Sequence, residues 1–164
     1  MPTSLATDLE PTACTAWPAS ASGRRLSVLV AIASYGTGQD HFLKQVVAEF
    51  RKLEMDCRIV VLSNIDKPVP GAEVLGGLPA RDTYSLPFAH RPLFIKHAND
   101  YDLFIYTEDD TLITPANVRA FLEVQQQLRE DQIAGFMRSE TSPEGVRYIV
   151  SVNSHFRWLP ETGF

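Results

Sequence analysis

Three adjacent acids, Glu108, Asp109 and Asp110, come at the end of a strongly apolar run at residues 103–105 and are the side chains best suited to chemistry. A short apolar run before a turn is typical of a buried strand. Carboxylates this close repel one another, so a divalent cation that neutralises them would account for their position. Mg²⁺ and Mn²⁺ prefer carboxylate oxygens and keep room for substrate phosphates. The triplet therefore predicts a metal site, and the alternative is a solvated acidic loop before the next helix.

The elements that would position this triplet alternate between strand and helix from residue 24 onward. Residues 26–33 are almost continuously apolar, as expected for a central parallel strand covered on both faces. A break follows, Asp40 is the predicted N-cap of a helix, and residues 58–63 form the second predicted strand. The pattern predicts an α/β fold, a mostly parallel sheet with helices on both faces. In such sheets ligands bind outside the carboxyl ends of the strands, where the acids would lie.

The segment at residues 64–86 is long, irregular and rich in Pro and Gly, which is typical of a functional or mobile loop. A brief strand is expected within it at residues 73–75. Residues 91–99 read as a helix that leads to the acid-ended strand. After the acids, Thr114 and Pro115 are the expected N-cap and first residue of another helix.

The last predicted elements are two strands, at residues 133–137 and 146–152, antiparallel to each other. Pro143 and Gly145 supply the turn residues between them.

The order of these elements, together with the acidic triplet, resembles the GT-A glycosyltransferases. Residues 101–115 look like the Glu-Asp-Asp version of the DXD motif in N-acetylglucosaminyltransferase I and its relatives, and the likeness extends over residues 26–152. The resemblance implies a Rossmann-like GT-A domain. It also implies a metal-dependent enzyme that transfers a sugar from a nucleotide diphosphate sugar, by analogy a UDP-sugar, to a hydroxyl of a glycan or another acceptor.

The resemblance also implies roles for the acids and for two cations. Asp110 would bind Mn²⁺ or Mg²⁺ directly, while Glu108 and Asp109 would act through ribose hydroxyls or through metal-bound water, which makes Glu108 a metal-site residue as well. Arg91 and Lys96, on the helix before the acids, would offset diphosphate charge. Arg91 equally fits a plain surface position, and Lys96 fits a cation near a helix end.

Two further positions match the nucleoside-binding places of that family. Ser34 and Tyr35, after the first strand, would hold the base, and Asn64 and Asp66 follow the second strand. Each position has a simpler alternative. Tyr35 could pack against the first helix, because an aromatic ring serves either purpose. Asp66 could be only a turn residue.

The acceptor side of such an enzyme is short of candidates. Inverting GT-A members use a carboxylate base, for which Glu140, with Glu144 nearby, is the candidate here. We expect the domain to be incomplete at its C-terminal end, because little chain follows residue 152. A non-catalytic fragment or pseudoenzyme that binds nucleotide or a protein partner is therefore the alternative function. A receiver-like or phosphatase-like domain is disfavoured, because its key acid would follow the first strand.

Size and composition set the remaining expectations. The chain has 164 residues and suits one domain, at residues 25–164, after a flexible tail at residues 1–24 that is rich in Ala, Ser, Thr and Pro. A net charge of −5 argues against nucleic-acid binding. Because residues 1–23 contain two acids and no apolar core, we do not expect them to be a signal peptide, and the apolar run at residues 26–33 is shorter than the ~20 residues that a membrane helix needs. The expected location is therefore the cytoplasm.

Overall fold

The computed structural model describes residue 17 and residues 23–78, 83–136, 138–145 and 147–149. The chain divides into two compact units, Met1–Glu123 and Val124–Phe164. The predicted tail at residues 1–24 falls outside the described part, apart from Trp17, Gly23 and Arg24.

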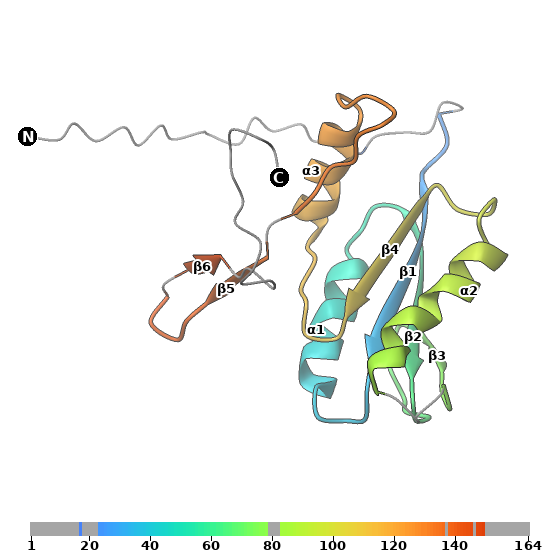
Figure 1. The fold of residues 1–164 in the computed structure, drawn as a ribbon, viewed down its shortest axis with the longest axis vertical. Coiled ribbons are helices and arrows are strands. Elements are labelled where there is room, and N and C mark those ends of the chain that lie inside the picture. The colour runs from blue at the N-terminus through green and yellow to red at the C-terminus, as the bar shows by residue number, and fades with distance from the viewer. Residues whose placement is uncertain (1–16, 18–22, 79–82, 137, 146, 150–164) are drawn as a thin grey trace, which may run out of the picture. The chain divides into compact units, whose positions relative to one another are not determined.

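The first unit is built on a four-stranded sheet, in which every pair of neighbouring strands is parallel (Figure 1). Its strands are β1 (Ser27–Ser34), β2 (Asp56–Ser63), β3 (Glu73–Leu75) and β4 (Leu103–Glu108), in the order β3-β2-β1-β4. The predicted class is confirmed: this is a Rossmann-like α/β fold. All eight residues of β1 are buried, as its unbroken apolar run predicts for a central strand.

Helices cover both faces of the sheet. Alternate residues of β1 point to opposite faces, and because both sets are apolar, both faces need to be covered. The helix α1 (Asp40–Phe50) packs on one face, while the 3₁₀ helix η1 (Thr83–Ala89) and α2 (His90–Lys96) pack on the other (Figure 1). The cluster on the α1 face includes Val28, Val30, Ile32, Leu43, Val46, Val47 and Phe50. The cluster on the α2 face includes Leu29, Ala31, Ala33, Val60, Leu62 and Leu86, with Leu93 and Phe94 packed against it.

The start of α1 differs from the prediction. The helix begins at Asp40, and Gln39 holds the N-cap position without a side-chain capping bond. The prediction of Asp40 as the N-cap is therefore wrong. The physical reason is that its carboxylate is used elsewhere: Asp40 Oδ1 accepts a hydrogen bond from Lys67 Nζ at 2.7 Å.

The start of α3 (Pro115–Gln125) confirms the prediction. The Thr114 hydroxyl accepts from the Asn117 N–H at 3.4 Å, and the Thr114 N–H donates to Asn117 Oδ1 at 2.9 Å. This reciprocal pair satisfies two N–H groups at the helix start, in the manner of a capping box. Val118, in the first turns of α3, is buried against the cluster on the α1 face.

The second unit contains a short antiparallel hairpin of β5 (Ser139–Thr141) and β6 (Arg147–Ile149). The predicted strand at residues 133–137 is wrong for its described residues, 133–136, which are irregular; residue 137 lies outside the described part. Ile133 is 81% exposed, so this apolar run has no sheet face to bury it. Of the predicted strand at 146–152, residues 147–149 form β6 and the others lie outside the described residues.

In the part of the chain that the structure describes, the longest helices, α1 and α3, have 11 residues each. None of the described helices is long and apolar enough to cross a membrane.

Candidate functional site

The carboxyl ends of β1, β2 and β4 meet at one edge of the sheet, the edge of the arrowheads in Figure 1. In the ladder Ala33 lies opposite Glu108, and Ser34 lies opposite Ser63. The turn after β1, which contains Tyr35, therefore neighbours the acidic triplet. This is the arrangement that the sequence predicts from parallel pairing alone.

Asp109 joins these two segments. The Ser34 hydroxyl donates to Asp109 Oδ2 at 2.5 Å, and the Asp109 N–H donates to the Ala33 carbonyl at 3.0 Å. Asp109 is only 8% exposed. Burial raises the pKa of its carboxyl above the ordinary value, and the Ser34 hydroxyl opposes that shift. The middle acid of the triplet is thus part of the framework of the site, and its predicted contact with substrate stays a prediction.

Glu108 and Asp110, on either side, are exposed. Their carboxylates make long contacts: the Tyr106 hydroxyl lies 3.4 Å from Glu108 Oε1, and the Thr111 hydroxyl lies 3.3 Å from Asp110 Oδ1. Burial and the Glu108 carboxylate raise the pKa of Tyr106 to about 12. Both acids are therefore accessible to a ligand from solvent.

Within the described ranges, no group of three His, Cys, Asp or Glu side chains is arranged to hold a metal ion. This observation bears on the kind of site that the acids could form. A cage made only of protein ligands does not fit. A cation held by one or two carboxylates together with substrate phosphates, as is common for Mg²⁺, needs no such group. The exposed oxygens of Glu108 and Asp110 suit this second kind of site.

Sequence reasoning missed Lys67, whose side chain is only 5% exposed. Its Nζ donates at 2.7 Å to each of three acceptors: Ser34 Oγ, the Gly36 carbonyl and Asp40 Oδ1. In the sequence this lysine stands between Asp66 and a proline and indicates nothing beyond a turn. Its burial could be predicted only from the tertiary contact between the loop after β2 and the turn after β1, which has no local sequence pattern.

The loop after β2 contributes the two predicted polar positions. Asn64 Oδ1 accepts the Gly36 N–H at 2.7 Å, which fixes the turn where Gly36 has a positive φ of 61°. Asp66 is exposed and lies directly against Gly76, where any added Cβ would overlap its Oδ1. The structure therefore brings Asn64 to the turn after β1. The absence of a side chain at Gly76 makes room for the Asp66 carboxylate.

Tyr35 itself is 48% exposed, so its ring is accessible at this edge. The start of α2 lies near the same edge, because His90 stacks on Tyr106 of β4 with ring centroids 4.3 Å apart. Arg91 follows His90, is exposed and places its guanidinium 4.6 Å from the centre of the Phe88 ring.

Lys96 is not brought to the acids. It is the last residue of α2, and the next residue, His97, lies 3.4 Å from the Arg58 guanidinium near the start of β2. Because α2 runs antiparallel to β4, its two ends serve opposite edges of the sheet (Figure 1).

Glu140 lies in β5 of the second compact unit. It is exposed, and its Oε1 accepts from the Arg138 guanidinium at 3.3 Å. Its predicted role as a base stays a prediction.

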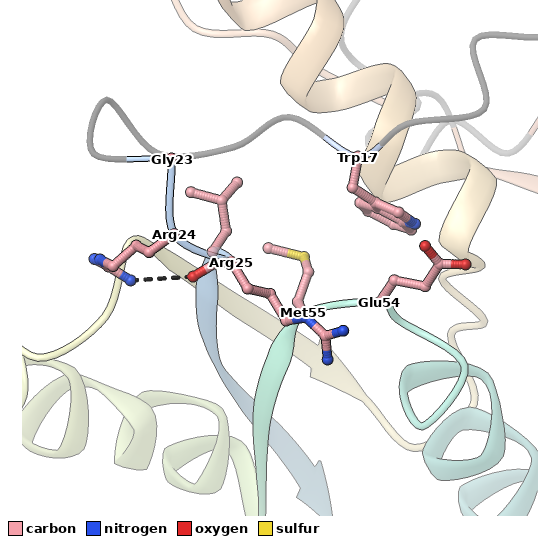
Figure 2. A pocket seen from close by; sticks show the side chains of 7 residues that line it. Trp17, Gly23, Arg24, Arg25, Glu54 and Met55 are labelled. Carbon is pink, nitrogen blue, oxygen red and sulfur yellow. Dashed lines mark hydrogen bonds between the residues drawn. The ribbon is translucent and has the colours of Figure 1, made fainter.

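The edge of the sheet opposite the acids has a pocket of about 210 Å³, shown in Figure 2. It is lined by Trp17, Gly23, Arg24, Arg25, Leu26, Glu54 and Met55. Most of these residues directly precede β1 or β2, so the pocket lies at the amino ends of the strands, away from the candidate site.

Comparison with known proteins identifies no family for this chain. No family profile matches the chain, and neither the curated proteins nor the solved structures contain a significant match.

Proposed function

We propose that this chain binds a nucleotide diphosphate sugar at the carboxyl edge of its sheet, together with Mn²⁺ or Mg²⁺, and transfers the sugar to a hydroxyl acceptor as a GT-A glycosyltransferase. The observation that supports the proposal is the bond between Ser34 and Asp109. It joins the turn proposed to hold the nucleoside to the acids proposed to hold the metal, so that one ligand can span both segments.

The acids fit a hard cation. Asp110 and Glu108 offer exposed carboxylate oxygens on both sides of the anchored Asp109, and oxygen is the donor that Mg²⁺ and Mn²⁺ prefer. Such a cation supplies Lewis-acid stabilisation of the charge that grows on a leaving diphosphate.

The remaining residues would bind and orient the donor. The exposed Tyr35 ring would stack on the base, and Asn64 and Asp66 would flank the nucleoside from the loop after β2. Arg91, near the same edge, would meet the diphosphate, because a guanidinium pairs well with phosphate oxygens. We retain no diphosphate contact for Lys96, which lies at the other end of α2.

Calorimetric titration with UDP, GDP and CMP, each with and without Mn²⁺, tests the proposal. We expect one nucleotide to bind tightly only with Mn²⁺, and Asp110→Ala to abolish that dependence. Asp56→Ala is the matched control, because Asp56 is also an exposed acid but opens β2 at the opposite edge. Equal metal-independent binding of all three nucleotides, or none at all, would contradict the proposal.

A second candidate is a nucleotide-binding module without catalysis, which could also serve a protein partner. The exposure of Glu140 and its pairing with Arg138 favour this alternative, because a carboxylate paired with a guanidinium is a weaker base. Hydrolysis or transfer of a UDP-sugar separates the two functions. Turnover that Glu140→Gln abolishes, with nucleotide affinity unchanged, would identify an enzyme with that base, whereas tight binding without turnover would favour the module.

A further inference from the structure

Lys67 is a buried ammonium group in the centre of the candidate site. It arrives from the loop after β2, yet all three of its acceptors belong to the segment from Ser34 to Asp40, the turn between β1 and α1. A buried cation is costly unless it is paired and fully hydrogen-bonded. The position of Lys67 is therefore specified by its partners.

The three N–H donors of Lys67 are all used within the protein. A lysine ammonium has three N–H donors, and the three acceptors at 2.7 Å account for all of them. Binding a phosphate would require breaking one of these bonds. Any effect of Lys67 on a ligand therefore passes through the residues that it holds.

One of these residues leads to the acidic triplet. The Ser34 hydroxyl has a single proton, which it donates to Asp109, so it meets Lys67 Nζ as an acceptor. The two hydrogen bonds therefore run in one direction: Lys67 donates to Ser34, and Ser34 donates to Asp109. Asp40, the direct ion-pair partner of Lys67, is half-buried and so is partly solvated, whereas Asp109 is buried.

We infer that Lys67 is a positioning residue of the site: it supplies the internal positive charge that allows Asp109 to be buried between Glu108 and Asp110. Through its bond to the Gly36 carbonyl, it also holds the turn after β1 against the loop after β2. The inference deepens the proposed function and rests on it for the ligand, while the charge pairing itself can be tested without any ligand.

The test is a double-mutant cycle of Lys67→Met and Asp109→Asn, measured by thermal unfolding without ligand. Breaking a buried charge network should lower Tm by roughly 10 °C in Lys67→Met. Adding Asp109→Asn should recover at least about half of that loss, because it removes the uncompensated charge and keeps an acceptor for Ser34. Lys52→Met is the matched control, since Lys52 pairs with Glu49 but its side chain is 62% exposed, and its Tm should stay within about 2 °C.

Two results would overturn the inference: a Lys67→Met variant as stable as Lys52→Met, or a double variant that loses the sum of both single effects. If Lys67→Met does not fold, a folded double variant supports the charge pairing and an unfolded one contradicts it.

Binding supplies the functional readout. If the Lys67→Met variant folds, its affinity for uridine in the absence of metal should be roughly tenfold lower than that of the wild type, because the turn that contains Gly36 loses its hydrogen bond to Lys67. An unchanged affinity for uridine would contradict the positioning role. Wild-type titration with UDP and Mn²⁺ decides the proposed function separately. A wild type that binds no nucleotide would refute that function, and the thermal cycle would still decide the charge pairing.

Discussion

Asp109 and Asp110 are neighbours of the same type with opposite surroundings, and alanine at each should have opposite effects. Asp109→Ala removes a buried, charge-assisted bond from Ser34 and a negative charge that is linked through the Ser34 hydroxyl to the buried Lys67. We expect a loss of about 2–4 kcal/mol in the free energy of unfolding. Asp110 is exposed, and removing it relieves repulsion within the triplet, so stability should stay level or rise by about 0.5–1 kcal/mol.

Urea unfolding followed by circular dichroism measures this difference. With a slope of about 1–3 kcal/mol per molar, the midpoint of Asp109→Ala should fall by roughly 1–2 M, and that of Asp110→Ala should not fall. Calorimetry then provides the second readout, in which Asp110→Ala loses Mn²⁺-dependent UDP binding although its fold is intact. Equal destabilisation by both variants would refute the assignment of Asp109 to the framework. Mn²⁺-dependent binding that survives Asp110→Ala would refute the metal assignment.

Three further predictions concern separate parts of the first unit. Tyr35→Ala should lower the affinity for UDP and for uridine without metal by roughly ten- to a hundredfold, since base stacking on an aromatic ring contributes about 1–3 kcal/mol. Asp110→Ala should barely change the affinity for uridine. Burial raises the pKa of the Cys57 thiol to about 11. In a Cys14→Ser variant, where Cys57 is the remaining thiol, the reaction with a disulfide reagent at pH 8 should be at least roughly tenfold slower than that of an ordinary thiol, because the thiolate fraction is lower. Hydrogen bonds from β1 hold the pKa of Asp102 below its ordinary value. Its contribution to stability is therefore present above about pH 4 and is lost as the pH falls further, and Asp102→Asn should flatten the acid side of a urea-unfolding pH series.

Each of these predictions has a contradicting result. Uridine affinity that is unchanged by Tyr35→Ala would remove the stacking role. Rapid labelling of Cys57 in the folded protein would show that its thiol is accessible. An acid limb that is as steep in Asp102→Asn as in the wild type would show that other carboxylates dominate acid unfolding.

The sequence predicts the sheet well because burial on both faces leaves a clear pattern. Residues 26–33 and 58–63 are apolar runs bounded by turn residues, and both form strands in the structure. Parallel pairing then places their carboxyl ends together, so the proximity of Tyr35 to the triplet also follows from the sequence. The same reasoning fails at residues 133–136, because an apolar run specifies a strand only where a sheet face is available to bury it.

The details of the site are harder to predict, because they depend on how loops fold back. A lysine in a loop reads as solvated, so the burial of Lys67 has no signature in the sequence. Its pairing with Asp40 in turn removes that residue from the capping role that local rules assign to it. Likewise, three consecutive acids look equivalent in the sequence, and only the position of Ser34 at the end of β1 distinguishes Asp109 from its neighbours.

The turn after β1 and the acidic triplet at the end of β4 follow strands that differ in their number of hydrogen-bonded neighbours. β1 has a parallel partner on each side, whereas β4, within the described residues, pairs only with β1. Local opening requires the least energy where backbone bonds are fewest, so β4 should exchange its amide hydrogens sooner than β1. The turn proposed to hold the nucleoside thus follows a strand with a partner on each side, and the acids follow a strand that pairs on one side among the described residues. A ligand that spans both should slow exchange chiefly in β4, making the acid-bearing strand the natural reporter of occupancy.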